Sequence, residues 1–260
     1  MGTDIHCCAE VQGADGTWKK LDGKPFPHPY YRADEERWNG PEYQGTNRVF
    51  YNRNYDLFAI LANVRNGSGF AGVDTGDGFN VIAADRGLPD DIDQEGYRLP
   101  EDWVDRESLT EMDLERYDDM EDLGDHSFTW MLLQELLDFD WEQVTTHRGW
   151  VDYETWKKWH DGGRKGGPDG WSGGISGAKI VHMVDADHTP EEIIAKHEEV
   201  DAKRDPKTDP KKYFAHNLYI QLEWTETYRE SVGEYVFERI EMLKQFGPPD
   251  KVRLVMGFDS

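Results

Sequence analysis

The chain is poor in cysteine and has no long apolar run. Its 260 residues include only two cysteines, the adjacent Cys7 and Cys8. Adjacent residues of a strand point to opposite faces, so this pair cannot build an internal disulfide framework, and a reducing compartment is expected. No stretch approaches the roughly 18 apolar residues of a membrane span, and the first residues lack the basic and apolar regions of a signal peptide. We therefore expect a cytoplasmic protein without membrane contact.

Positive charge is also scarce. There are 29 Lys and Arg residues against 53 Asp and Glu, which gives a formal net charge of −24. This charge repels phosphate backbones and anionic membranes, so direct nucleic-acid binding is not expected. A solvated acidic surface, a high-salt habitat and mimicry of nucleic acid toward a basic partner all remain open. The 10 Trp, 12 Tyr and 11 Phe residues indicate a conventional core, which disfavours mimicry.

Common catalytic motifs are missing as well. Residues 67–80 hold five glycines but lack both the Gly-Lys-Ser/Thr ending and the Gly-x-Gly-x-x-Gly pattern of phosphate loops, so a mobile or inserted loop is expected. The chain has neither HExxH nor CxxC, and Ser127 has no nucleophile elbow around it. No standard hydrolase signature is present.

The most informative segment is residues 53–67. Its apolar residues recur at the spacing of one helical face, namely Leu57, Ile60, Leu61 and Val64. Asn54 is placed to cap the first turn and Gly67 to end the helix. Arginines flank both ends, as expected of a helix that lines a pocket for an anion. A capped amphipathic helix with surface arginines is the alternative. The candidate ligand-binding residues here are Arg53, Asn54, Tyr55 and Arg65.

The first strand supplies candidate acid/base groups. Asp4 and His6 are two residues apart on a strand expected over residues 3–11, so they share a face. Metallophosphoesterases use such an Asp-x-His pair for a metal, but their Gly-Asn-His and Gly-His-x-His motifs are missing here, so that family is excluded. A weaker divalent-metal or acid/base cluster of Asp4, His6 and His126 remains a hypothesis. Ordinary polar residues at the end of a strand are the alternative. The full set of candidate catalytic residues is Asp4, His6, Asp56 and His126, and Trp130 is a further candidate ligand contact.

The remaining segments alternate between helical and strand patterns. We expect a hairpin at residues 15–16, a strand over 178–184, a strand over 218–224 and a last strand over 252–258. Helices are expected to begin near residues 108, 127, 189 and 228. The sum is an α+β fold with a mixed or antiparallel sheet of about five strands, helices on one face and long Gly/Trp-rich loops. One domain over residues 1–260 is expected, with an acidic insertion around 90–125 and a loop-rich insertion around 147–178.

Several segments taken together resemble a known group of sequences. They are Asp-Ile-His at 4–6, Arg-Asn-Tyr-Asp-Leu-Phe-Ala-Ile-Leu-Ala-Asn-Val-Arg at 53–65, Arg-Gly-Leu-Pro-Asp-Asp at 86–91, Asp-His-Ser-Phe-Thr-Trp at 125–130 and Val-Arg-Leu-Val-Met-Gly-Phe-Asp at 252–259. Over nearly its whole length the chain resembles an uncharacterised family of proteins encoded by tailed bacteriophages and prophages. The resemblance implies a phage origin and the cytoplasm of an infected bacterium, and it implies no activity.

Two functions follow from these patterns. The first is a phage accessory enzyme acting on a nucleotide-like or other phosphorylated small molecule, with or without a divalent metal ion. The second is a non-catalytic binder, either a sponge for a small-molecule anion or an acidic inhibitor of a host protein.

Overall fold

The computed structural model describes residues 2–51, 53–98, 110, 120–177, 180–203 and 218–259. The chain folds into two compact units. Unit 1 comprises Met1–Val64, Asn80–Asp140 and Val232–Ser260, and unit 2 comprises Arg65–Phe79 and Trp141–Ser231. The strands and helices confirm the α+β class. The single domain expected from the sequence stays a prediction.

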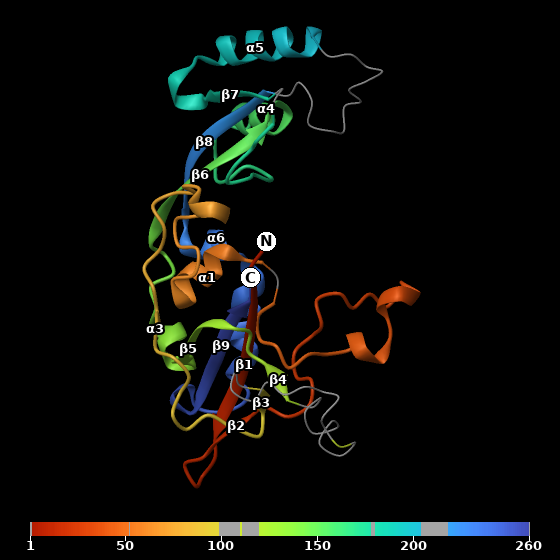
Figure 1. Cartoon of the computed structure of the whole chain (residues 1–260), viewed down its shortest axis with the longest axis vertical. Helices are drawn as coiled ribbons and strands as arrows, with labels where there is room; N and C mark the ends of the chain where they lie inside the picture. Colours follow the sequence, from red (N-terminus) through yellow and green to blue (C-terminus); the bar gives the residue numbers. More distant parts are fainter. Residues whose placement is uncertain are drawn as a thin grey trace. The chain divides into compact units, whose positions relative to one another are not determined.

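Unit 1 is built on a four-stranded antiparallel sheet in the order β2-β1-β9-β5 (Figure 1). Its strands are β1 (Asp4–Gln12), β2 (Trp18–Lys20), β5 (His126–Leu132) and β9 (Val252–Asp259). The β1–β2 hairpin is the one expected from the sequence. A separate parallel pair joins β3 (Tyr97–Arg98) and β4 (Glu121–Asp122).

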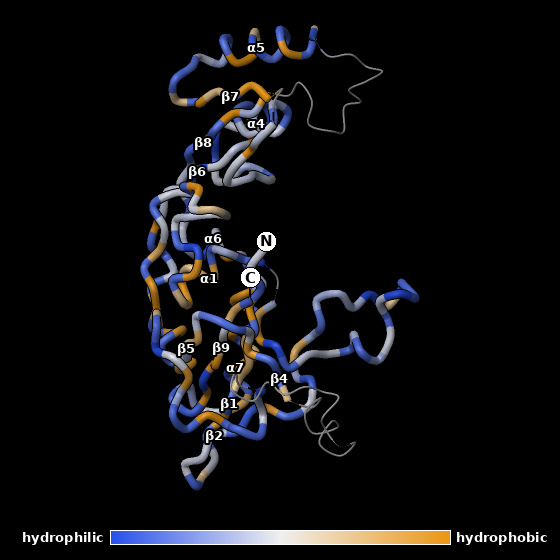
Figure 2. Tube along the Cα trace, in the orientation of Figure 1, coloured by the Kyte–Doolittle hydropathy of each residue, from blue (hydrophilic) through white to orange (hydrophobic). Residues whose placement is uncertain are grey.

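Strand β1 is covered on both faces, whereas its alternating sequence predicts one covered face. Ile5 lies on the face of Phe258, which packs edge-on against Phe58 of helix α1. Cys8 lies on the other face, in a cluster formed by Ile92, Tyr97, Leu123 and Val255. The segments around residues 92–97 and 123 thus cover the side that was expected to meet water. Figure 2 shows the apolar residues along α1 and β9 in orange.

The described part of unit 1 contains all or part of four helices: α1 (Tyr55–Ala62), α3 (Leu133–Asp138), α6 (Tyr228–Val232) and α7 (Glu234–Leu243). The side chain of Asn54 accepts a hydrogen bond from the Leu57 N–H at 3.1 Å, which confirms the expected cap. The helix ends earlier than expected, because Asn63 adopts the left-handed conformation at φ 61° and terminates it before Gly67. Likewise Gly233, at φ 79°, separates α6 from α7, where one continuous helix was expected.

The expected helix starting at Ser127 is wrong in its first half. Residues 126–132 form β5, in which Trp130 pairs with Val255 and Met131 with Leu254 of β9. Pairing with a strand more than 100 residues away outweighs the local helical pattern, and α3 begins only at Leu133.

Unit 2 contains a three-stranded mixed sheet in the order β6-β8-β7. Strand β8 (Leu218–Thr227) pairs antiparallel with β6 (Val144–Asp152) and parallel with β7 (Val181–Val184). Helices α4 (Tyr153–Asp161) and α5 (Pro190–Ala202) contribute Trp156 and Ile193 to its core. Strands β8 and β9 belong to different sheets, and the described residues form three sheets instead of one sheet of about five strands.

Residues 147–178 do not form the long loop expected from their Gly and Trp content. Strand β6 continues to Asp152, whose side chain caps α4 by accepting from the Thr155 N–H at 2.8 Å. Helix α4 has no aliphatic stripe to mark it in the sequence, because its buried side consists of two tryptophans, Trp156 and Trp159. In contrast, the capping box of Thr189 and Glu192 starts α5 as expected.

The other described elements are short 3-10 turns at Glu36–Trp38, Pro41–Tyr43, Phe70–Gly72, Asp185–Asp187 and Pro249–Lys251. The helix expected from residue 108 lies outside the described residues, apart from Thr110. None of the helices in the described part of the chain has the length and apolar character needed to cross a bilayer.

Candidate functional site

Asp4 and Arg53 form a two-pronged ion pair where β1 begins. Nε of Arg53 donates to Oδ1 of Asp4 at 2.8 Å, and Nη2 donates to Oδ2 at 2.9 Å. The hydrogen bonds from Arg53 lower the pKa of the Asp4 carboxyl. A Cβ atom on Gly2 would overlap the guanidinium, so a glycine at this position lets Arg53 lie flat against the backbone. About half of each side chain faces solvent, so the pair is open to ligands.

His6 lies two residues further along and contacts two acceptors. Its Nε2 lies 3.0 Å from Oδ2 of Asp259, and its Nδ1 lies 3.0 Å from the carbonyl oxygen of Asp122. Both partners accept hydrogen bonds, so a ring that is protonated on both nitrogens satisfies both contacts. His6 is buried whereas the Asp259 side chain is 46 % exposed, which leaves the carboxylate as the accessible member of the pair.

Asp259 joins these two pairs. Its Oδ1 accepts from the Asp4 N–H at 3.3 Å while its Oδ2 contacts His6. Sequence reasoning missed this residue, because the alignment of Asp4 with Asp259 across the sheet cannot be read from either strand alone. Its only signal was its position at the end of the last strand, within the 252–259 motif. We call Asp4, His6, Arg53 and Asp259 the strand-end cluster.

His126 begins β5 at the same end of the sheet but lies on the opposite face from His6. His126 pairs with Phe258, which also pairs with Ile5, and residues paired across strands share a face. His6 follows Ile5 directly on β1, so it points to the other face. The register shifts between His126 and Thr129, and Ser127 has φ 54°. This bulge turns the His126 ring onto the Phe258 ring, with the centroids 6.2 Å apart. The structure therefore does not bring His126 to Asp4 and His6 in the expected cluster.

The described residues include no group of three or more His, Cys, Asp or Glu side chains able to hold a metal ion. The divalent metal considered from the sequence thus lacks a ligand set in the part of the chain that the structure describes.

The other residues selected around α1 hold the backbone in place. Asn54 donates from Nδ2 to the Val232 carbonyl at 2.8 Å, in addition to capping the helix. The Tyr55 hydroxyl accepts from the N–H of Thr3 at 3.4 Å, which ties α1 to the start of β1. Asp56 lies in the first helical turn and is half-buried. Arg65 belongs to unit 2, so it is not part of the strand-end cluster.

Trp130 lines a separate cleft of about 600 Å³ in unit 1, which we call the tryptophan cleft. Trp18 and the guanidinium of Arg253 also line it, with Arg253 4.3 Å from the Trp18 ring. Arg86 lies 5.5 Å from the Trp130 ring and is bound by both carboxylate oxygens of Glu135. Arg86 is thus paired with Glu135, and Arg253 is paired with Glu10 and with Asp91 of the cleft lining. The remaining charged lining residues are the acidic Asp90 and Asp250.

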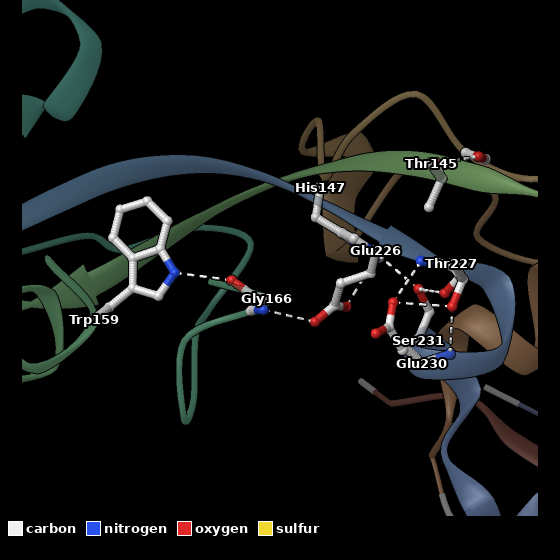
Figure 3. Close-up of polar contacts among 10 residues, drawn as sticks. Thr145, His147, Trp159, Gly166, Glu226, Thr227, Glu230 and Ser231 are labelled. Atoms are coloured by element: carbon white, nitrogen blue, oxygen red, sulfur yellow. Dashed lines mark hydrogen bonds and ion pairs between the residues drawn. The ribbon is translucent and has the colours of Figure 1, made fainter. Parts of the chain in front are cut away.

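Unit 2 contains a hydrogen bond between His147 and Ser231 in which the histidine donates, whereas a catalytic histidine would accept the proton of the serine (Figure 3). Nε2 of His147 lies 2.9 Å from Oγ of Ser231, which itself donates to the Thr227 carbonyl at 3.1 Å. His147 is therefore the donor and cannot accept the serine proton. Glu226 lies 3.6 Å from the same ring nitrogen rather than behind the ring. Burial also lowers the pKa of His147. This contact is structural.

Comparison of the chain with family models, curated proteins and solved structures finds no match. Function is therefore inferred from the geometry of the strand-end cluster and the tryptophan cleft.

Proposed function

We propose that the chain is a phage accessory enzyme acting in the host cytoplasm on a phosphorylated small molecule such as a nucleotide. One observation carries the proposal: Asp259 contacts His6 through one oxygen and the backbone of Asp4 through the other, beside the exposed Asp4–Arg53 pair. This arrangement puts a carboxylate–imidazole pair next to a guanidinium at one end of the sheet. Such groups supply acid/base chemistry and anion binding, respectively.

Arg53 is the anion-binding group in this proposal. Its planar fork matches two phosphate oxygens as well as it matches the Asp4 carboxylate. Ion pairs between exposed side chains are weak, so a phosphate of higher charge can replace Asp4 on the guanidinium.

Asp259 is the general base and His6 positions it. The Asp259 carboxylate is accessible, so it can take a proton from the water that attacks the phosphorus. His6 holds the carboxylate by its Nε2–H and is itself held by the Asp122 carbonyl. The reaction class is hydrolysis of a phosphate ester or anhydride.

The test is turnover of a panel of nucleoside mono-, di- and triphosphates and cyclic dinucleotides, followed by chromatography and phosphate release. We expect Asp259→Asn to abolish turnover and Arg53→Lys to raise KM, because lysine cannot form the two-pronged contact. Arg86→Lys is the matched control, since Arg86 forms an equally two-pronged pair with Glu135 away from the cluster. No turnover and no ligand-induced rise in Tm across the panel would rule out the enzyme.

A non-catalytic binder is the second candidate, and the tryptophan cleft favours it. Two indole rings and an acidic rim suit a planar or basic group, such as a side chain of a host protein. In that case the wild-type chain should capture host proteins from a lysate. The Trp130→Ala variant should no longer capture them, whereas the Asp259→Asn variant should. A sponge would instead bind a nucleotide at Arg53 and release it unchanged.

A further inference from the structure

The middle strand of unit 2 has an edge that is only partly covered. Strand β7 pairs with β8 from Leu218 to Gln221, and the last pair is Val184–Gln221. Strand β6 pairs with the other edge of β8 as far as Thr227. From Leu222 onward, β8 therefore has no strand neighbour on the β7 side within the described residues.

The outer edge of β6, in contrast, is covered by loops. The Thr146 carbonyl accepts from the Asp77 N–H at 2.9 Å, and the Arg148 N–H donates to the Thr75 carbonyl at 2.9 Å. Thr146 and Arg148 therefore direct their backbone groups away from β8. In an antiparallel pair this direction alternates from residue to residue.

The same alternation identifies the backbone groups on the open edge of β8. His147, between Thr146 and Arg148, directs its N–H and C=O toward β8, where its partner is Trp224. Trp224 thus points its backbone groups at β6, and its neighbours Glu223 and Thr225 point theirs the other way. No described residue forms a backbone hydrogen bond with Glu223 or Thr225 on that side.

A cavity of about 320 Å³ lies against this edge. Its lining residues are Trp159, Arg164, Gly166, Glu223, Trp224 and Thr225. The Trp159 indole donates to the Gly166 carbonyl at 2.8 Å, which fixes the loop at the side of the cavity (Figure 3). The indole N–H of Trp224, a residue only 5 % exposed, is buried and has no partner in the described part of the chain. Such an unsatisfied buried donor points to an acceptor supplied from outside.

The surface beside the edge is acidic. Arg148 is the centre of an ion-pair network with Asp74, Asp77 and Glu223, so three carboxylates surround one guanidinium. Each carboxylate side chain is more than half exposed. Asp74 and Asp77 lie on the far side of β6, so Glu223 is the carboxylate next to the open edge. Because Glu223 shares Arg148 with two other carboxylates, its charge is only partly neutralised and attracts a basic residue beside it.

We propose that the open edge of β8 binds an extended basic peptide of a partner protein as an added β-strand. The peptide backbone pairs with the N–H and C=O groups of Glu223 and Thr225, the mode by which sheet edges recognise extended chains. A Lys or Arg side chain lies beside Glu223. This site lies in unit 2 and does not depend on the strand-end cluster of unit 1.

The first test uses fluorescein-labelled peptides and the full chain, measured by fluorescence anisotropy. The probe has four Lys-Val repeats, and the controls are four Glu-Val repeats and a Lys-Val peptide N-methylated at every residue. We expect the plain Lys-Val peptide to bind and the Glu-Val peptide not to bind. The N-methylated peptide keeps the charge but cannot donate to the edge, so it should bind at least about tenfold more weakly.

The second test changes the edge itself. No described residue accepts from the Thr225 N–H, so Thr225→Pro should leave the fold intact while weakening peptide binding by about tenfold or more. Thr225→Val is the matched control, since it keeps the N–H and the side-chain size, and it should bind as the wild type does. Hydrogen exchange gives a further readout: the Glu223 and Thr225 amides should exchange quickly in the free protein and become protected with the peptide.

Each outcome bears on one site. Equal binding of the plain and N-methylated peptides, or no binding of the Lys-Val peptide to the wild type, overturns the proposal. If Thr225→Pro lowers Tm strongly, the N-methylated peptide still decides, because it leaves the protein unchanged. Loss of turnover in the Asp259→Asn variant would bear only on the strand-end cluster.

Discussion

Arg253 donates from Nε to Oε2 of Glu10 at 2.5 Å, and both side chains are almost completely buried. Arg253 also contacts Asp91, and its guanidinium lies over the Trp18 ring. Burial raises the pKa of Glu10 more than the Asp93 N–H and Arg253 lower it. The pair joins β1 to β9, and its Arg253 lines the tryptophan cleft.

Removing one partner of this pair should destabilise unit 1 strongly. Arg253→Met keeps the length of the side chain but leaves the Glu10 carboxylate buried without its cation. We expect a loss of about 3–5 kcal/mol in the free energy of unfolding at pH 7, measured with urea. Arg86→Met, at a partly exposed pair, should lose clearly less. A loss below about 1 kcal/mol for Arg253→Met would contradict the role of the buried pair.

The loss should shrink in acid. Glu10 has a folded pKa above its unfolded value of 4.5, so its charged form is disfavoured in the folded chain. Without Arg253, the buried Glu10 carboxylate reduces the free energy of unfolding by a larger amount. This reduction applies at pH values above the pKa of Glu10 in the unfolded chain. It disappears as the pH falls toward 4.5, where the unfolded chain is protonated too. Urea unfolding at pH 7 and pH 5 should therefore show a smaller difference between wild type and Arg253→Met at pH 5.

His147 should make unit 2 less stable in mild acid. Burial lowers its folded pKa below the unfolded value of 6.5, so unfolding takes up a proton. The resulting stability is complete above pH 6.5 and is lost as the pH falls toward the folded pKa. His147→Gln can still donate to Ser231 but cannot titrate. Its free energy of unfolding should vary less between pH 7 and pH 5.5 than that of the wild type.

A methyl group at residue 2 should displace Arg53. In Gly2→Ala the new Cβ overlaps the guanidinium, which has to leave its position on Asp4. The pKa of Asp4, held low by Arg53, should then rise toward 3.8. An NMR titration of the Asp4 carboxyl carbon measures this shift. Gly170→Ala provides a control because a Cβ there meets no atom within 4 Å and the backbone is not in the left-handed region, and the Asp4 pKa should be unchanged in that variant.

The two cysteines should be inert in the folded protein. Both are buried, and burial raises the pKa of Cys8 to about 12. Thiolates are therefore rare at neutral pH. A thiol-specific colorimetric reagent should label neither residue in native protein and both in urea. Fast labelling under native conditions would show that the cover over β1 opens readily.

Local patterns in the sequence predicted local structure well. The strand at β1, the Asn54 cap and the Thr189 capping box each depend on neighbours within a few residues, and each is present in the structure. The pairing of His6 with Asp259 spans nearly the whole chain, so no short window of sequence contains it.

The errors have the same origin. Trp130 was expected in a helix because leucines follow it at helical spacing, but pairing with Val255 places it in a strand. His126 was expected next to His6 because both are polar residues at the ends of expected elements, His6 on a strand and His126 just before a helix. The bulge at Ser127 reverses which face His126 occupies, and a one-residue insertion of this kind leaves no mark in the sequence pattern.

Strand β1 pairs with β9 along almost its full length, from Asp4 with Asp259 to Val11 with Val252. During synthesis on a ribosome, β1 is therefore made long before the strand with which it pairs. Throughout that interval Cys7, Ala9 and their neighbours form an apolar segment with an unpaired backbone, which is a substrate for holdase chaperones. Production of this protein should accordingly be limited by aggregation of nascent chains more than by the stability of the finished fold.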